Sequence, residues 1–151
     1  MSRVIGLPGE TIEIRDTKVF INGAELREMR TLVEGGFETG PLREVSTEGD
    51  GSYRVFYQAR DEYSNASDPR RNLLQFVEGN SLSRTGPAFD IPAGHYFVMG
   101  DNRDNSFDSR FWGTVPRESI TGKPYMIYWS VEKDESGNQR TRWNRVFSRL
   151  K

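Results

Sequence analysis

Residues 11–23, TIEIRDTKVFING, carry the clearest fold signal in this chain of 151 residues. Apolar and polar side chains alternate over residues 11–15, which is the pattern of a strand with one buried face. A second β-branched run follows at 18–21, and the Asn-Gly pair at 22–23 is the strongest short signal for a hairpin turn. Together with the short apolar run that precedes them, these residues predict a β-meander over residues 3–26.

Strand signals also dominate the rest of the chain. Residues 27–50 are rich in Gly, Glu and Thr without a clear period, and they predict an irregular arm with one or two short strands. We find no amphipathic helix longer than about one turn, so the predicted class is mainly β, with antiparallel sheets, hairpins and little helix. Further strands are expected at 53–60, 73–79, 94–100 and 125–129, polar or loop segments at 61–72 and 80–92, a hairpin tip near 137–138, and a basic tail at 143–150 that forms a strand or one helical turn.

The composition excludes several classes of function. The formal net charge is −1 with 28% charged residues, so there is no overall basic field that would attract nucleic acid. The absence of cysteine excludes disulfides and thiolate metal sites, and the single histidine, His95, leaves at most one imidazole for a zinc site or a Ser-His-Asp triad. No apolar run approaches the ~20 residues of a membrane-spanning helix, so we expect the chain as given to be soluble.

A dense polar segment, GDNRDNSFDSR at 100–110, follows the apolar strand signal at 94–100. Its aspartates suggest calcium, but the spacing does not fit an EF-hand loop. A loop that began at Asp101 would need Gly where Ser106 stands, and one that began at Asp104 would need Glu where Val115 stands. From the residues alone, three alternatives stay open: a solvated turn, a structural network of carboxylates and guanidinium groups, and a functional site.

Two segments together resemble a known family. The polar loop with the downstream WGTVP resembles one signature of the type I signal peptidases, the bacterial leader peptidases, and the opening RVIGLPGE resembles another. The likeness extends to the first hairpin and to the C-terminal end, whereas the middle of the chain carries no motif of the family. The matching stretches are 3–10, 19–26, 100–116 and 142–150, and the unmatched middle is about 27–90.

The resemblance implies a membrane-bound serine endopeptidase that removes signal peptides from exported preproteins with a Ser/Lys dyad. The general-base lysine of such an enzyme must be neutral, so its pKa must fall far below ~10.4 through burial against apolar surface. The family implies no cofactor and no metal, and His95 is then a packing or surface residue. By position, Ser106 corresponds to the serine that orients the lysine amine, Arg3, Asp108 and Arg110 to a supporting charged network, and Asp101 and Asn102 to residues that fix the loop.

The sequence departs from the family at the base itself. The lysine belongs directly before Arg3, where this chain has Ser2, and a serine hydroxyl cannot replace an amine as general base. The nucleophilic serine of the family lies upstream of that lysine, in a motif that this sequence does not contain. We therefore expect the C-terminal part of a signal peptidase, without membrane anchor, nucleophile segment or base, with an artificial start, and inactive alone.

The resemblance also implies an organisation and a location. We expect residues 1–26 to begin the catalytic core, 27–92 to form a β-rich insertion, and 93–151 to return to the core. The parent enzyme is expected in the bacterial cytoplasmic membrane, with this region on the extracytoplasmic side. Its expected partners are signal peptides and the membrane surface.

The sequence leaves more than one interpretation open for the two C-terminal tryptophans and for the function of the chain. Trp129 and Trp143 suit a membrane interface, although core or hairpin positions are the favoured interpretation for both. Apolar surface near residues 4–6 and 96–99 is expected to be uncovered and to promote self-association. The competing functions are a standalone extracytoplasmic β module that binds peptides or a partner protein, and a structural calcium-binding β domain.

Overall fold

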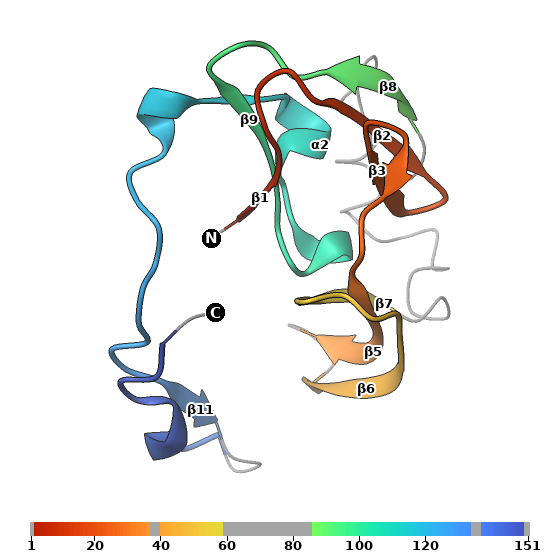
Figure 1. Ribbon diagram of the computed structural model, residues 1–151. Helices are drawn as coiled ribbons and strands as arrows, with labels where there is room; N and C mark the ends of the chain where they lie inside the picture. The colour runs from red at the N-terminus through yellow and green to blue at the C-terminus, as the bar shows by residue number, and fades with distance from the viewer. Residues whose placement is uncertain (1, 37–39, 59–85, 134–136, 150–151) are drawn as a thin grey trace. The chain divides into compact units, whose positions relative to one another are not determined.

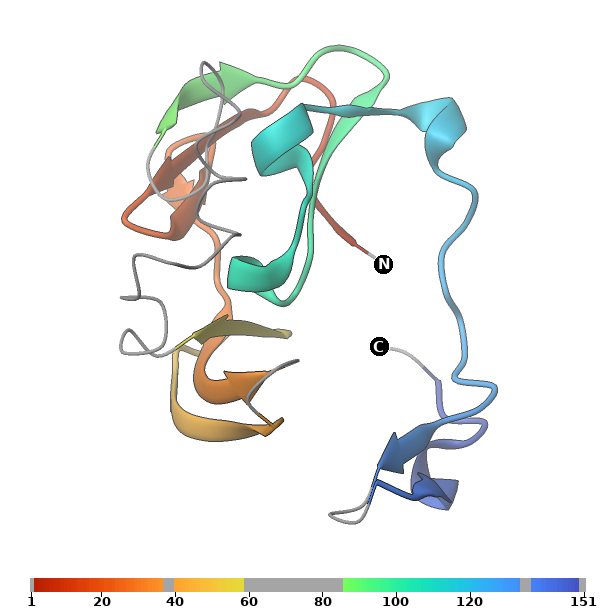
Figure 2. The same ribbon diagram turned by 180° about the vertical axis from the view of Figure 1, so that it is seen from behind.

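The computed structural model describes residues 2–36, 40–58, 86–133 and 137–149. Its contacts divide the chain into two units, Met1–Ser119 and Ile120–Lys151, and Figures 1 and 2 show the ribbon from opposite sides. Strands predominate, and the one α-helix among the described residues is the single turn α2, Ser109–Trp112. The predicted class, mainly β with little helix, is confirmed.

The first sheet of the N-terminal unit has the order β1-β9-β10 and is antiparallel. Its strands are β1 (Arg3–Gly6), β9 (His95–Met99) and β10 (Val115–Pro116), so β9 lies in the centre. The register pairs Arg3 with Met99. Two predicted strands that are about 90 residues apart in the sequence therefore meet here, with β1 as an edge (Figure 1).

The second sheet has the order β4-β3-β2-β8. Its strands are β2 (Thr11–Arg15), β3 (Lys18–Ile21), β4 (Ala24–Glu25) and β8 (Gly86–Asp90). The turn at 22–23 has φ angles of 51° and 81°, as an Asn-Gly hairpin requires. The meander prediction is confirmed for β2 to β4 but is wrong for β1, which pairs with β9 instead.

One apolar core joins these two sheets. Ile12 and Ile14 point into it while their neighbours along β2 do not, which is what the alternating sequence predicts. Its buried members are Ile5, Ile12, Ile14, Val19, Ile91, Phe97 and Met99.

The third sheet consists of β5 (Met29–Gly36), β6 (Gly40–Glu48) and β7 (Arg54–Gln58). β5 pairs with β6 in antiparallel and with β7 in parallel orientation. The sequence predicts an irregular arm at 27–50 with one or two short strands; the two strands β5 and β6 are present, but they are long and paired, so the irregular arm is wrong. The length of these strands could not be read from the sequence, because few apolar residues mark their buried face: in β5, the polar Thr31 is buried as well as Val33.

The expected loop at 80–92 is also partly wrong, because β8 occupies Gly86–Asp90 and pairs with β2. The predicted segments at 61–72 and 73–79 lie outside the described residues. The structure does not expose the apolar surface expected at 96–99, since Phe97 and Met99 are buried in the core. On β1, Val4 is 43% exposed, and self-association stays a prediction.

The C-terminal unit contains one described hairpin, β11 (Val131–Lys133) with β12 (Gln139–Thr141), which confirms the hairpin predicted near 137–138. The strand predicted at 125–129 is wrong: this segment forms an isolated bridge, at Met126, and no strand. The tail begins with a short 3₁₀ helix, η3 (Trp143–Arg145). The expected division of the chain at 26/27 and 92/93 stays a prediction.

Gly51 provides a test of the third sheet. A Cβ at this residue would collide with the backbone of Arg27 and Glu28, just before β5 begins. We expect Gly51→Ala to lower the free energy of unfolding by about 1–3 kcal/mol, because backbone atoms rather than side-chain ends would have to move. The control is Gly122→Ala, whose Cβ meets nothing within 4 Å, and equal denaturant midpoints for the two variants would contradict this packing.

Candidate functional site

The polar segment at 100–110 leaves the end of β9 and folds into two short helices. Its first half forms the 3₁₀ helix η1, Arg103–Asn105, and its second half leads into α2. The loop is thus an ordered part of the N-terminal unit, which argues against a plain solvated turn.

The backbone of this loop is tied to β7. Phe56 N–H donates to the Asp101 carbonyl at 2.8 Å, and Phe56 forms a parallel bridge with Asn102. Gln58 N–H donates to Asp104 Oδ2 at 2.9 Å. The third sheet therefore holds the position at which the chain leaves β9.

Asp108 and Arg110 form a buried bidentate ion pair. Arg110 Nε lies 2.8 Å from Asp108 Oδ1, and Arg110 Nη2 lies 2.9 Å from Oδ2. Asp108 is also the N-cap of α2, where its Oδ1 accepts the Arg110 backbone N–H at 3.2 Å. Its Oδ2 accepts Gly100 N–H at 2.8 Å, so one carboxylate fastens the helix to the end of β9.

The surroundings of Asp108 favour its charged form. Burial by itself would raise the pKa of this carboxyl group, but the hydrogen bonds and charge of Arg110 outweigh burial. Gly100 N–H and the Ser106 hydroxyl add further hydrogen bonds, and the net effect lowers the pKa below its usual value. The ion pair is therefore present at neutral pH.

Ser106 lies against Gly100. A Cβ at Gly100 would collide with Ser106 Oγ, so the serine hydroxyl occupies the space that a side chain at Gly100 would fill. The same hydroxyl helps to lower the pKa of the Asp108 carboxyl group. The absence of a side chain at Gly100 therefore lets a hydroxyl group pack directly on the end of β9.

Arg3 does not join the Asp108–Arg110 pair, and the prediction of one network of these three residues is wrong. Arg3 instead forms a bidentate ion pair with Asp101: Nε lies 2.9 Å from Oδ1 and Nη2 lies 2.9 Å from Oδ2. The Arg3 guanidinium also stacks on the ring of Tyr53, 4.2 Å from its centre. The charges near β1 thus form two separate pairs.

A third ion pair, Arg103–Glu28, was missed by sequence reasoning. Both residues are buried, and Arg103 Nη1 lies 3.1 Å from Glu28 Oε2. The Tyr53 hydroxyl donates to Glu28 Oε1 at 2.9 Å. The two charges are 75 residues apart, so no short motif contains both, and Glu28 lies in the segment for which the sequence predicts an irregular arm.

Ser2, at the position where the family resemblance places the base, is exposed and directly precedes β1. Because Arg3 pairs with Met99, the same register continued by one residue places Ser2 across from Gly100. Residues directly opposite in an antiparallel pair project to the same face. The Ser106 hydroxyl therefore packs on the cross-strand neighbour of residue 2.

The loop carboxylates bind guanidinium and backbone N–H groups. Asp101 pairs with Arg3 and Asp108 with Arg110, while Asp104 accepts a backbone N–H. Among the residues that the structure describes, no group of three or more His, Asp or Glu side chains is arranged to hold a metal ion.

The remaining residues singled out in the sequence lie elsewhere. His95, at the start of β9, is half-buried, and its Nδ1 lies 3.2 Å from the Ala93 carbonyl oxygen. Trp129 and Trp143 are 52% and 71% exposed and pack edge to face, with ring centres 5.6 Å apart. Neither indole is a core residue.

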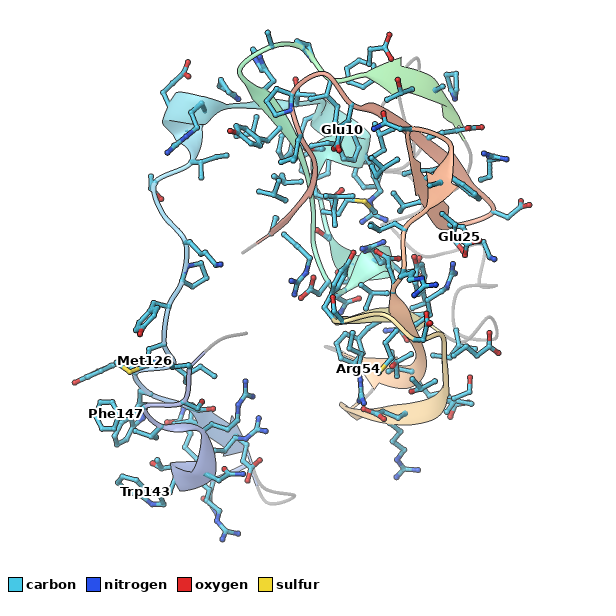
Figure 3. All side chains as sticks on the ribbon, viewed as in Figure 1. Glu10, Glu25, Arg54, Met126, Trp143 and Phe147 are labelled. Atoms are coloured by element: carbon cyan, nitrogen blue, oxygen red, sulfur yellow. The ribbon has the colours of Figure 1, made fainter. Side chains whose placement is uncertain are left out.

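The C-terminal unit exposes a set of large apolar side chains that includes these two indoles. Figure 3 labels three of the set, which project to the same side of that unit in this view. The set consists of Tyr125, Met126, Tyr128, Trp129, Val131, Trp143 and Phe147. No helix within the described ranges is long and apolar enough to cross a membrane.

The family model of the signal peptidases, peptidase S26, matches residues 2–129. Signal peptidase I of Aquifex aeolicus is 71% identical over 112 residues, which cover 60% of this chain and 44% of that protein. Signal peptidase I of Pseudomonas aeruginosa is 33% identical over 150 residues, which cover 91% of this chain and 46% of that protein. The chain thus spans less than half the length of these curated relatives.

A solved structure also matches. It is a signal peptidase I from Enterococcus faecalis V583, with 29% identity and a TM-score of 0.40, and the match covers 80% of this chain and 78% of that one.

The Asp108–Arg110 pair generates a stability prediction. Asp108→Asn leaves Arg110 buried without its counter-charge, and we expect it to lower the free energy of unfolding by about 3–5 kcal/mol at pH 7. The pKa of Asp108 is lowered in the folded protein, so its stabilisation is complete above the unfolded value of 3.8 and is lost as the pH falls through the folded value.

The difference between wild type and Asp108→Asn should therefore shrink below about pH 4. Urea unfolding of both proteins from pH 7 to pH 2 measures it. The exposed pair Arg27–Asp50, at 3.6 Å, supplies the control Asp50→Asn, and a difference for Asp108→Asn that stays constant with pH would contradict the ion-pair account.

Proposed function

Because this chain belongs to the signal peptidase family, peptidase S26, we propose that it forms the C-terminal part of a serine endopeptidase that removes signal peptides from exported preproteins. The whole enzyme works with a Ser/Lys dyad, in which a neutral lysine accepts the proton of the nucleophilic serine. The base belongs at residue 2, directly before Arg3.

One observation carries this proposal: the packing of Ser106 on Gly100. Gly100 is the residue that the register of β1 and β9 places across from residue 2. A lysine at residue 2 would therefore have the Ser106 hydroxyl beside it, in the space that a side chain of its cross-strand neighbour would fill. Ser106, which packs on Gly100, would accept a hydrogen bond from the amine and fix its direction.

The charged residues then act as supports rather than as reacting groups. The Asp108–Arg110 pair holds the backbone on both sides of Ser106, through Gly100 N–H and the N-terminus of α2. The Arg3–Asp101 pair holds the residue that follows the base. None of these groups supplies a nucleophile or a neutral base, and Ser2 cannot accept the proton, so we propose that this chain alone does not cleave peptides.

A chimera tests the dyad. Residues 3–151 are joined to the upstream part of the Aquifex aeolicus signal peptidase I with lysine at residue 2, and cleavage of a signal-peptide substrate is measured. We expect cleavage by the chimera and none by the 151-residue chain. We expect a loss of about 10²–10⁴-fold in kcat when the lysine is replaced by serine, because the general base is then absent.

In the same chimera, Ser106→Ala should lower kcat, while the matched control Ser119→Ala, at an exposed position, should leave it unchanged. Hydrolysis that persists without the lysine, or a cleaving 151-residue chain, would contradict the proposal. An inactive chimera with the normal fold would favour the alternative of a standalone β module that binds peptides or a partner protein.

We further propose that the C-terminal unit contacts the membrane surface, with the enzyme in the bacterial cytoplasmic membrane and this region on its extracytoplasmic side. The exposed indoles of Trp129 and Trp143 support this proposal, since amphipathic rings favour the membrane–water interface. The guanidinium group of Arg149 stacks on the ring of Tyr125 at 5.3 Å. A basic, aromatic surface suits anionic lipid headgroups.

Vesicle binding tests the membrane surface. We expect the double variant Trp129→Ala/Trp143→Ala to bind phosphatidylglycerol vesicles at least about tenfold more weakly than wild type, because two large apolar side chains no longer enter the interface. Trp112→Ala is the control, since Trp112 is 45% exposed but belongs to the N-terminal unit. Equal binding by wild type and the double variant in a sedimentation assay would reject this surface.

A further inference from the structure

Arg3 is held on two sides. Asp101 binds the edge of its guanidinium group through two hydrogen bonds of 2.9 Å, and the Tyr53 ring covers one face at 4.2 Å. An ion pair alone fixes the plane of the group only in part, and a ring stacked on its face restricts it further. The side chain of the first residue of β1 therefore has one well-defined place.

Tyr53 is fixed in turn by groups behind it. Its hydroxyl donates to Glu28 Oε1 at 2.9 Å, and its carbonyl accepts Met29 N–H at 3.0 Å. Burial, followed by the nearby charge of Glu28, raises the pKa of Tyr53, so the phenol remains a donor over the working pH range. The ring thus cannot turn away from Arg3 without breaking a bond to Glu28.

Glu28 is held by Arg103, and this closes a ring of side chains. Arg103 stands in η1, two residues after Asp101, so the path Asp101–Arg3–Tyr53–Glu28–Arg103 returns to the loop where it began. It connects β1, the residues beside β5 and β7, and the polar loop. We call this set the five-residue ring.

We propose that Tyr53 and Glu28 are positioning residues of the peptidase reaction, which hold the strand that carries residue 2 in register with Ser106. They act through Arg3 and touch neither the base nor the substrate. The inference rests on the proposed function, since it assigns a part in the same reaction. It gives a role in cleavage to two residues that directly precede strands of the third sheet.

The first experiment uses the 151-residue chain and does not depend on catalysis. Hydrogen exchange of the Arg3 Nε–H group and of the β1 amides is followed by NMR in wild type, Tyr53→Leu and Tyr53→Phe. Tyr53→Leu removes the stacked ring, and exchange at Arg3 should become roughly three- to tenfold faster. Tyr53→Phe keeps the ring but loses the bond to Glu28, so its effect should be smaller and in the same direction.

The matched control is Phe20→Leu. Phe20 also carries a stacked guanidinium group, that of Arg15, at 3.9 Å, but it lies in β3 and has no bond to the five-residue ring. This variant should leave exchange at Arg3 unchanged. Equal exchange at Arg3 in wild type and both Tyr53 variants would overturn the inference.

The second experiment measures cleavage by the full-length protein encoded by the parent gene. Displacing the base affects the chemical step more than substrate binding, so Tyr53→Leu should lower kcat by about tenfold with little change in KM. Phe20→Leu should change neither constant. A variant that matters only for folding would lose soluble protein and thermal stability without this separation of kcat from KM.

The outcomes separate the two proposals. If wild-type full-length protein does not cleave while exchange at Arg3 responds to Tyr53→Leu, the proposed function fails and the contact stands. If wild type cleaves and Tyr53→Leu keeps its kcat, the positioning role is overturned, whatever the exchange shows. Should Tyr53→Leu fail to fold, Tyr53→Phe decides: a lower kcat at unchanged KM supports the role, and an unchanged kcat overturns it.

Discussion

The buried ion pair between Glu28 and Arg103 is the constraint on which the N-terminal unit depends. Two charges removed from water are costly unless each keeps its partner and further hydrogen bonds. Tyr53 supplies one such bond to Glu28, and Gly51 packs against the backbone of Glu28 where no side chain could fit. The third sheet and the polar loop must therefore form together, since either one alone would leave a charge unpaired.

The same principle explains why the loop is crowded with charge. Each pair fastens a different boundary: Asp108–Arg110 joins α2 to the end of β9, Arg3–Asp101 joins β1 to the loop, and Glu28–Arg103 joins the loop to the third sheet. A segment with few apolar contacts of its own gains order from these pairs. Ser106 stands among these pairs, with its hydroxyl packed on Gly100.

Much of the fold could be predicted from local patterns. The alternation in β2, the β-branched run of β3 and the Asn-Gly turn need only neighbours in sequence. The length of β5 could not be predicted in this way. Its buried face includes the polar Thr31, so apolar and polar residues do not alternate clearly along the strand. At 125–129 the aromatic run has the pattern of a strand. Among the described residues, however, it forms only one isolated bridge, from Met126 to Arg149, and does not pair with a strand.

The ion pairs of the candidate site also differ in how far apart their partners lie in the sequence. Asp108 and Arg110 are two residues apart, so their pairing follows from the sequence, whereas the partners of Arg3 and Arg103 lie 98 and 75 residues away. These separations also govern how the molecule folds. Contacts between distant residues form only after long loops have closed, which slows folding. The five-residue ring cannot close before the loop at 100–110 has been synthesised, because Asp101 and Arg103 belong to that loop.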